Sequence, residues 1–172
     1  VSDQSADAAV AEICAGFADR LSIRHIWHRD GKRQASANVN NALRHASGEI
    51  VKILFQDDYL NGVDAMKTVA QSFEKGAKWQ LCGSGVSRNG GAVERPMVPR
   101  LTPKLMFGKN TVSSPSVLAM RCADLAYFDE ELIWLMDVDL YQRLWDQLGD
   151  PVISPDTLVV NRVHAGQVSA SV

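Results

Sequence analysis

The chain has 172 residues, of which 46% are hydrophobic and 22% are charged, and its formal net charge is -2 at pH 7. This composition is ordinary for a folded domain and excludes disordered, collagen-like and repeat-polymer proteins. The near-neutral charge provides no basic surface for nucleic acid, and no apolar stretch approaches the roughly 20 residues of a membrane-spanning helix. We therefore expect a soluble protein with no nucleic-acid partner and no integral membrane segment.

Three cysteines, Cys14, Cys82 and Cys122, lie far apart among apolar residues. An odd number of widely spaced cysteines is typical of buried free thiols in a reducing compartment. The first residues are polar and acidic, unlike the apolar region of a signal peptide. We therefore expect a cytoplasmic protein.

Helix-like and strand-like patterns alternate along the first half of the chain, with turn residues between them. In chain order the sequence predicts a helix over 7–21, a strand over 23–27, a helix over 39–46, a strand over 50–55, a helix over 63–73, a strand over 79–86, an irregular loop over 95–104, a strand from 117, a helix over 132–148 and a strand over 158–160. This alternation favours a parallel α/β sheet. No internal repeat or linker interrupts it, so the chain is predicted to be one domain.

Two of these elements have distinctive apolar patterns. The first predicted helix carries apolar residues at helical spacing, and we expect this stripe to be buried. The stripe consists of Val10, Ile13, Cys14, Phe17 and Leu21. The run over 50–55 is almost continuously apolar, which is typical of a strand that is covered on both faces.

Two adjacent carboxylates, Asp57 and Asp58, come directly after this buried strand. Ligands of open α/β sheets bind outside the carboxyl ends of the strands. Neighbouring anions are costly to bury without a cation, and their hard oxygen atoms suit Mg²⁺ or Mn²⁺. A solvated turn that caps the next helix is the alternative, but the apolar run favours a metal site at exposed strand-end carboxylates.

Three more positions are candidates for the same site. Asp3 follows a probable strand end, although an Asx turn is the simpler explanation of that residue alone. Asp137 and Asp139 lie two residues apart on a predicted helix, so at most one faces the cleft, and we interpret Asp139 as a surface charge. His164 follows a strand and precedes a flexible segment, whereas the other three histidines are interpreted as structural or exposed.

The chain lacks the short motifs of several large protein classes. It contains no Gly-x-Gly-x-x-Gly, no phosphate-loop lysine motif, no Gly-x-Ser-x-Gly and no Cys-x-x-Cys. These absences argue against a dehydrogenase, an NTPase, a serine hydrolase and a zinc protein.

Four segments together resemble family-2 glycosyltransferases, and the resemblance covers nearly the whole chain. Residues 1–5 are similar to the family's second-strand turn, whose acidic residue holds the nucleotide base. Residues 38–51 resemble the helix and strand that lead into the metal motif, and 55–58 take the place of its Asp-x-Asp or Asp-Asp signature. Residues 128–140 are similar to the segment that carries the catalytic base.

The resemblance implies an α/β, Rossmann-like nucleotide-diphospho-sugar transferase fold of the A type with a mostly parallel central sheet. In a single domain over 1–172, residues 1–86 would form the nucleotide-binding part and 87–172 the acceptor side. The family's first strand and its nucleotide-contacting loop have no counterpart before Val1. Met136 stands where the family often has glutamate.

The resemblance also assigns roles to the candidate residues. It implies that Asp3, Asp57 and Asp58 bind the nucleotide sugar, that Asp58 binds Mn²⁺ or Mg²⁺, and that Asp137 is the catalytic base. We add His164 as a second candidate metal ligand. Asp3 and Asp58 are expected to face one cleft, because parallel strands place their carboxyl ends on one edge.

The implied reaction is the inverting, metal-dependent transfer of one sugar from a nucleotide-diphosphate donor to a hydroxyl of a glycan or lipid-linked acceptor, as in cell-envelope polysaccharide biosynthesis. An inactive fragment that binds nucleotide or sugar, and a metal-dependent nucleotidyltransferase, are the alternatives. Homo-oligomers and peripheral attachment to the inner face of a membrane stay open.

Overall fold

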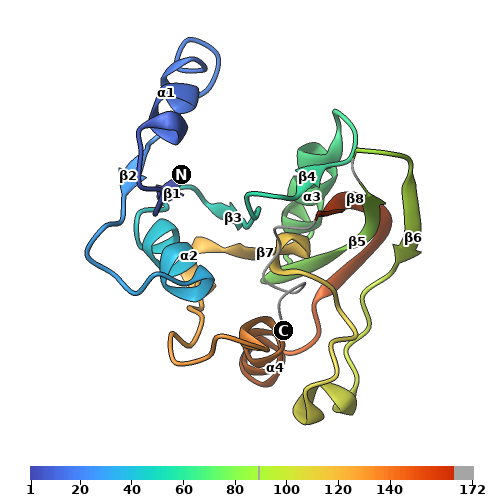
Figure 1. Ribbon diagram of the computed structural model, residues 1–172. Helices are drawn as coiled ribbons and strands as arrows, with labels where there is room; N and C mark the ends of the chain where they lie inside the picture. The colour runs from blue at the N-terminus through green and yellow to red at the C-terminus, as the bar shows by residue number, and fades with distance from the viewer. Residues whose placement is uncertain (89, 165–172) are drawn as a thin grey trace.

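The computed structural model describes residues 1–88 and 90–164 (Figure 1). Its α-helices are α1 (Ala9–Ala15), α2 (Ala35–Arg44), α3 (Ala65–Glu74) and α4 (Met136–Leu148). Its strands are β1 (Ser2–Asp3), β2 (Ile26–Trp27), β3 (Ile50–Lys52), β4 (Tyr59–Leu60), β5 (Trp79–Arg88), β6 (Val93–Met97), β7 (Leu118–Arg121) and β8 (Val152–Val163). Short 3₁₀ helices are η1 (Pro103–Phe107), η2 (Pro115–Val117) and η3 (Cys122–Asp124).

The described strands form a small sheet and a large one. β1 pairs with β2, and the larger sheet has the order β3-β7-β5-β8-β4, with β6 on β5. The α/β class with a helix-flanked central sheet is confirmed. Pairing is parallel in β1–β2 and β5–β8, whereas β7 runs antiparallel to β3 and β5. β4 with β8 and β5 with β6 are antiparallel as well, so β5–β8 is the one parallel pair of the described larger sheet, and the expectation of a mostly parallel sheet is wrong. One reason is that the chain makes a long excursion after β5 and re-enters the sheet as β7 in the opposite direction.

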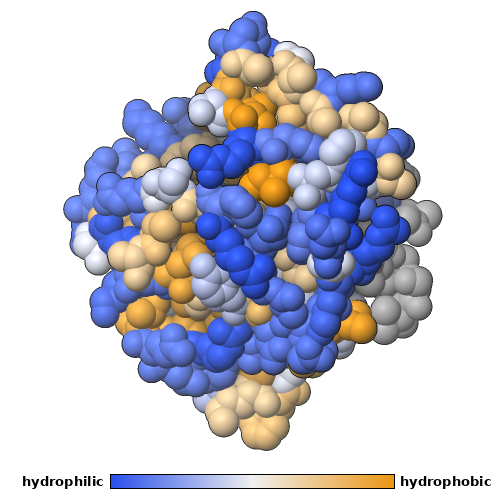
Figure 2. All heavy atoms as spheres, turned by 90° about the vertical axis from the view of Figure 1, so that its left-hand side faces the viewer, coloured by the Kyte–Doolittle hydropathy of each residue, from blue (hydrophilic) through white to orange (hydrophobic). Residues whose placement is uncertain are grey.

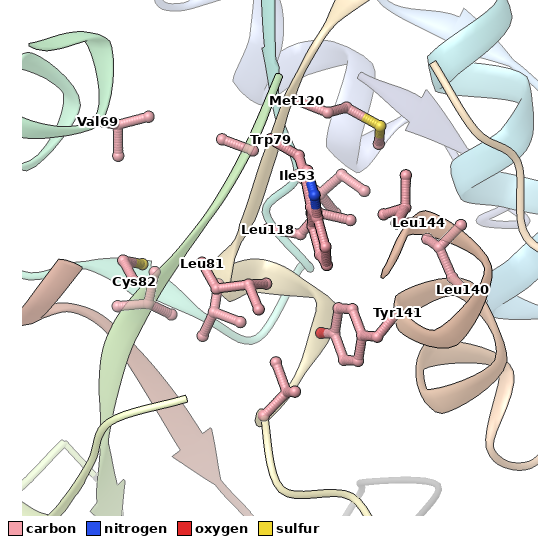
Figure 3. Close-up of a cluster of buried hydrophobic side chains, with 14 of the residues drawn as sticks. Ile53, Val69, Trp79, Leu81, Cys82, Leu118, Met120, Leu140, Tyr141 and Leu144 are labelled. Carbon is pink, nitrogen blue, oxygen red and sulfur yellow. The ribbon is translucent and has the colours of Figure 1, made fainter. Parts of the chain in front are cut away.

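The core is built around β5, which is covered on both faces. Figure 3 shows Tyr141 and Leu144 of α4 on the side of Trp79 and Leu118, while Val69 of α3 lies on the other side of the strand. These five side chains are at most 2% exposed. The indole Nε1 of Trp79 donates a hydrogen bond to the carbonyl oxygen of Gly149, 2.9 Å away, which fixes the end of α4 to the start of β5.

The apolar stripe predicted to be buried on the first helix lies mostly on the surface. Cys14 is buried, but Ile13 is 62% exposed and Leu21 is 58% exposed. The helix is also shorter than predicted and projects at one end of the molecule, beside β1 and β2 (Figure 1). Figure 2 shows apolar atoms gathered at that end of a mostly hydrophilic face.

Several other boundaries also differ from the sequence prediction. The strand after residue 50 ends at Lys52, its three residues are only partly buried and it lies at the edge of the sheet, so the expectation of a strand over 50–55 covered on both faces is wrong. The predicted loop over 95–104 overlaps β6. The strand predicted over 158–160 is the centre of the longer β8. The last helix begins at Met136 rather than at 132, because Leu135 has a φ of 61° and a left-handed residue cannot continue a right-handed helix.

The structure also bears on two expectations from the composition, the state of the cysteines and the absence of a membrane-spanning helix. Cys14 and Cys82 are buried, Cys122 is partly buried, and all three are free thiols. In the ranges 1–88 and 90–164, no helix has the length and apolar character needed to cross a membrane.

The ammonium group of Lys52 on β3 is enclosed by backbone carbonyl groups. Its Nζ donates hydrogen bonds to the carbonyl oxygens of Ser116 and Ile53. Burial lowers the pKa of this ammonium group from 10.5 to about 8, although the charges of Cys82 and Asp58 act in the opposite direction. The folded protein therefore holds this proton less tightly than the unfolded chain does.

We expect the contribution of Lys52 to stability to increase as the pH rises from about 8 to 10.5, because the unfolded chain binds more protons over this window. Relative to Lys52→Met, whose side chain carries no proton, the free energy of unfolding should rise by up to about 3 kcal/mol across the window. Urea unfolding of both proteins over this pH range measures the difference. Parallel pH dependences would contradict a buried charge at this position.

Candidate active site

Asp57 and Asp58 follow the predicted strand and lie in the turn between β3 and β4, a short strand that the sequence analysis did not predict. Asp58 is only 9% exposed, which corrects the expectation of an exposed strand-end carboxylate. Its Oδ2 accepts hydrogen bonds from Ser114 Oγ and Asn161 Nδ2, each at 3.0 Å. The Asp58 side chain is therefore fixed by one residue of a loop and one residue of β8.

The pairing of β4 with β8 brings the predicted residue His164 to this turn. β4 and β8 are antiparallel, with Tyr59 opposite Val160, so the residues before Tyr59 lie beside those after Val160. His164 Nε2 lies 3.7 Å from Asp57 Oδ2. An open pocket of about 320 Å³ is lined by Gln56, Asp57, Arg162 and His164.

Asp137 is half-buried in the first turn of α4. Its Oδ1 accepts a hydrogen bond from the backbone N–H of Val138 at 2.9 Å, and its Oδ2 accepts one from Asn110 Nδ2 at 2.6 Å. Burial raises the pKa of the Asp137 carboxyl, and backbone hydrogen bonds oppose this effect in part. Asp139 has a different partner, because its carboxylate forms an ion pair with Arg143 at 2.7 Å.

A loop over 110–114, which the sequence analysis missed, joins the surroundings of Asp58 and Asp137. Asn110 contacts Asp137, and Ser114 contacts Asp58. Between them, Ser113 Oγ donates to Asn161 Oδ1 at 3.1 Å. The signals in the sequence were the cluster of Asn and Ser before a buried strand and the polar Asn161 after an apolar run.

Asp3 lies at the end of β1, in the separate small sheet. It is 4% exposed, and Oδ1 accepts hydrogen bonds from the backbone N–H and the hydroxyl of Ser5. His25 Nε2 lies 3.0 Å from Oδ2. Burial raises the pKa of Asp3, but the hydrogen bonds from Ser5 and His25 outweigh it, so the pKa is lowered. Within the described residues, no contact joins this side chain to Asp57 or Asp58.

Among the carboxylates before α4, Glu130 is tied to α2. The amide of the buried Asn40 donates to Glu130 Oε1 at 2.9 Å and to the carbonyl oxygen of Phe128 at the same distance. Arg44 Nη2 also donates to Glu130 Oε1, at 3.0 Å. The hydrogen bonds from Asn40 and Arg44 lower the pKa of Glu130. Asn40 is a structural residue that the sequence analysis did not single out.

The donor set near Asp58 fits a cation that is shared with a substrate. Across the part of the chain that the structure describes, no group of three or more His, Cys, Asp or Glu side chains could hold a metal ion. Mg²⁺ usually binds one or two carboxylates together with substrate phosphates. Asp58 Oδ1 receives no hydrogen bond from the described residues, so this oxygen is available to a cation.

A second pocket, of about 330 Å³, lies between η1 and the start of α4. Its lining includes the apolar Leu105, Met106, Trp134 and Leu135, together with Asp139. Trp134 is 53% exposed and Met106 is 70% exposed. The pocket therefore exposes an aromatic side chain, Trp134, that precedes Asp137 by three residues in the sequence.

Comparisons with known proteins agree with this architecture. The profile of Glycosyl transferase family 2 matches residues 1–136, so the match ends one residue before Asp137. A comparison with curated proteins gives no match. The solved structure of S. aureus TarS 1–349 has a TM-score of 0.71 at 22% identity, over 93% of this chain and 49% of that chain. TarS 1–349 in complex with UDP-GlcNAc has a TM-score of 0.69 at 22% identity, over 98% and 50%.

The chain therefore spans about half the length of these solved structures. At 22% identity the likeness shows a shared fold and nothing finer. The family profile is stronger evidence, since it covers most of the sequence, from β1 to the start of α4. The chain belongs to glycosyltransferase family 2.

Proposed function

We propose that this protein transfers a sugar from a nucleoside-diphosphate donor to a hydroxyl acceptor, with inversion at the anomeric carbon. The observation that carries the proposal is the pair of carboxylates at the 110–114 loop. One, Asp58, is a buried residue directly before β4, and the other, Asp137, has a raised pKa at the start of α4. Membership of the family supports a donor site at the first and a base at the second.

On the donor side, the diphosphate would lie beside Asp57 and Asp58. Arg162 and His164 line the same pocket, and Arg162 suits an anionic ligand because an arginine is always charged. The TarS complex with UDP-GlcNAc supports a uridine nucleotide sugar as the donor. Asp3 would contact the nucleotide base.

A divalent cation fits this site. We propose that Asp58 holds Mn²⁺ or Mg²⁺ together with the donor diphosphate, with His164 as the second candidate ligand. The cation would supply Lewis acidity that neutralises charge on the leaving diphosphate.

Asp137 would act on the acceptor. Its carboxylate takes the proton of the attacking hydroxyl as the hydroxyl oxygen forms a bond to the anomeric carbon. The bond from that carbon to the donor phosphate breaks on the opposite side, and its electron pair leaves with the nucleoside diphosphate. A single displacement of this kind inverts the anomeric configuration. Burial of Asp137 brings its pKa closer to neutral pH, where a general base is most effective.

The pocket between η1 and α4 is our proposed acceptor subsite. An apolar lining with an accessible Trp134 and a few polar groups is typical of sites that bind small organic ligands. A glycan ring or the sugar of a lipid-linked acceptor fits that chemistry. Asp137 does not line this pocket, but it adjoins Val138, which does, so the acceptor's hydroxyl would reach Asp137 across the first turn of α4.

Turnover of UDP-GlcNAc tests the proposal. We expect the protein to release UDP in the presence of Mn²⁺, slowly to water and faster with an oligosaccharide acceptor, and we expect Asp58→Asn to abolish this release. The assay quantifies UDP and pyrophosphate separately. Release of pyrophosphate would indicate nucleotidyl transfer instead. Calorimetric binding of UDP-GlcNAc without release of either product would indicate an inactive binding protein.

A further inference from the structure

The side chain of Asn110 is fixed in one orientation by four contacts. Its Oδ1 accepts hydrogen bonds from the backbone N–H groups of Val112 and Ser113, both at 2.9 Å. Its Nδ2 donates to the carbonyl oxygen of Ser113 at 3.0 Å and to Asp137 Oδ2 at 2.6 Å. If the amide were flipped, Oδ1 of Asn110 would face the carbonyl oxygen of Ser113 and Oδ2 of Asp137. The NH₂ group of Asn110 therefore faces the Asp137 carboxylate.

The loop that carries Asn110 is itself held tightly. Ser113 has a φ of 119°, a conformation that side-chain-bearing residues rarely adopt. The phenol of Tyr141 donates to the carbonyl oxygen of Ser113 at 3.2 Å, and the hydroxyls of Ser113 and Ser84 lie 2.8 Å apart. Such a backbone conformation persists only where the surrounding contacts determine it, so Asn110 is presented to Asp137 by a rigid support.

We propose that Asn110 is a positioning residue that holds the Asp137 carboxylate in the orientation in which it accepts the acceptor's proton. The proposal rests on the proposed function, in which Asp137 is the base. Val138 N–H binds Oδ1 and Asn110 binds Oδ2, so the plane of the carboxylate is defined at both oxygen atoms. The backbone N–H of Asp137 also contacts the carboxylate, and the lone pair that these contacts leave is available to the incoming hydroxyl.

Asn110 also acts on the charge of Asp137. A hydrogen bond to the ionised carboxylate favours the ionised form and so opposes burial, which raises the pKa. Among the residues that the structure describes, Asp137 forms no ion pair: Tyr141 is a buried phenol, and Asp139 on the same helix is paired with Arg143. The charges of Asp137 and Asp58 both contribute to the raised pKa of Tyr141, but burial contributes most.

Two substitutions separate positioning from loop structure. Asn110→Asp keeps an oxygen for the N–H groups of Val112 and Ser113 but sets a second carboxylate against Asp137. Asn110→Ser keeps a short oxygen acceptor for the loop but cannot reach Asp137. Thermal unfolding shows whether each variant is folded. If Asn110→Asp does not fold, Asn110→Ser alone carries the test.

We expect the pKa of Asp137, followed by carbon-13 NMR of its carboxyl group, to rise in Asn110→Ser and to rise further in Asn110→Asp. The kcat for UDP release should fall roughly ten- to hundredfold, as for the loss of a hydrogen bond to a charged group, with little change in the KM of the donor. The acidic limb of the pH profile should move to higher pH in both variants. A role limited to the loop predicts none of these changes.

An unchanged pKa of Asp137 in both variants, or an unchanged kcat in the presence of a shifted pKa, would overturn the proposal. The NMR titration needs no turnover. If the parent protein releases no UDP, the proposed function fails, and the titration still decides whether Asn110 controls the charge of Asp137.

Discussion

Asp137→Asn is expected to lower the kcat for sugar transfer by about 10²–10⁴-fold, because the amide keeps the shape of the side chain but cannot accept the proton. Donor binding, measured as the dissociation constant of UDP-GlcNAc, should change little, since the donor site lies at Asp57 and Asp58. The variant should fold, because the amide oxygen can still accept a hydrogen bond from Val138 or Asn110.

The matched control is Asp139→Asn, two residues further along α4. Its carboxylate forms a partly exposed ion pair with Arg143, and pairs of this kind contribute about 0.3–0.5 kcal/mol on a helix. Because Asp139 also lines the proposed acceptor subsite, this variant can change the KM of the acceptor, but we expect its kcat to stay near the parental value. Transfer at the parental rate by Asp137→Asn, or a larger loss in Asp139→Asn, would assign the base to another carboxylate, with Asp129, Glu130 and Glu131 the nearest in sequence.

The raised pKa of Asp137 has opposite consequences for activity and stability. Activity should fall as the pH decreases through the raised pKa, because protonated Asp137 cannot act as a base. Folding stability should instead fall as the pH rises from the ordinary aspartate pKa of 3.8 through the raised value, since the folded state binds the proton more tightly over that window. At neutral pH, Asp137→Asn should therefore be at least as stable as the parent protein.

The second large effect concerns Asp58. We expect Mn²⁺ and UDP together to stabilise the parent protein, by about 2.7 kcal/mol at one hundred times the dissociation constant. Either ligand alone should do less, because the cation is shared between Asp58 and the diphosphate. Asp58→Asn should lose this joint stabilisation, and the measurement is the shift in thermal unfolding temperature with each ligand and with both.

Asparagine is a better replacement than alanine at this position, because Asp58 is buried and accepts hydrogen bonds from Ser114 and Asn161. Asp156→Asn, an exposed position on β8 away from this turn, is the matched control and should respond as the parent does. Equal shifts in Asp58→Asn and the parent would place the cation elsewhere.

The sequence could identify candidate site residues where the signal lies in residues adjacent in the chain. Asp57 and Asp58 stand out because they end an apolar run, and a charge at the end of a buried strand has few structural explanations. Asp137 and Asp139 are two residues apart, so on any helix their side chains point to different faces and contact different partners, wherever that helix begins. The family resemblance also depends on short contiguous segments, and most of them lie within residues 1–136, which the family profile matches.

Burial and long-range contacts depended on tertiary structure. Amphipathic spacing in α1 shows which residues share a face, but it does not show what covers that face, and most of its stripe lies at the surface. The start of α4 depends on the left-handed backbone conformation of Leu135. A leucine in the sequence gives no sign of that conformation, so the sequence could not locate the start of the helix.

The sequence by itself therefore determined the α/β class and the family, and it singled out the aspartates after the apolar run and on the last helix as candidates, because each of these is encoded in residues close together in the chain. Only the tertiary structure identified Asn110, Ser114 and Asn161 as their partners. These small polar side chains resemble ordinary turn residues in the sequence. The long excursion after β5 and the antiparallel register of β4 with β8 bring them to Asp58 and Asp137, and contacts between residues so far apart leave no local pattern.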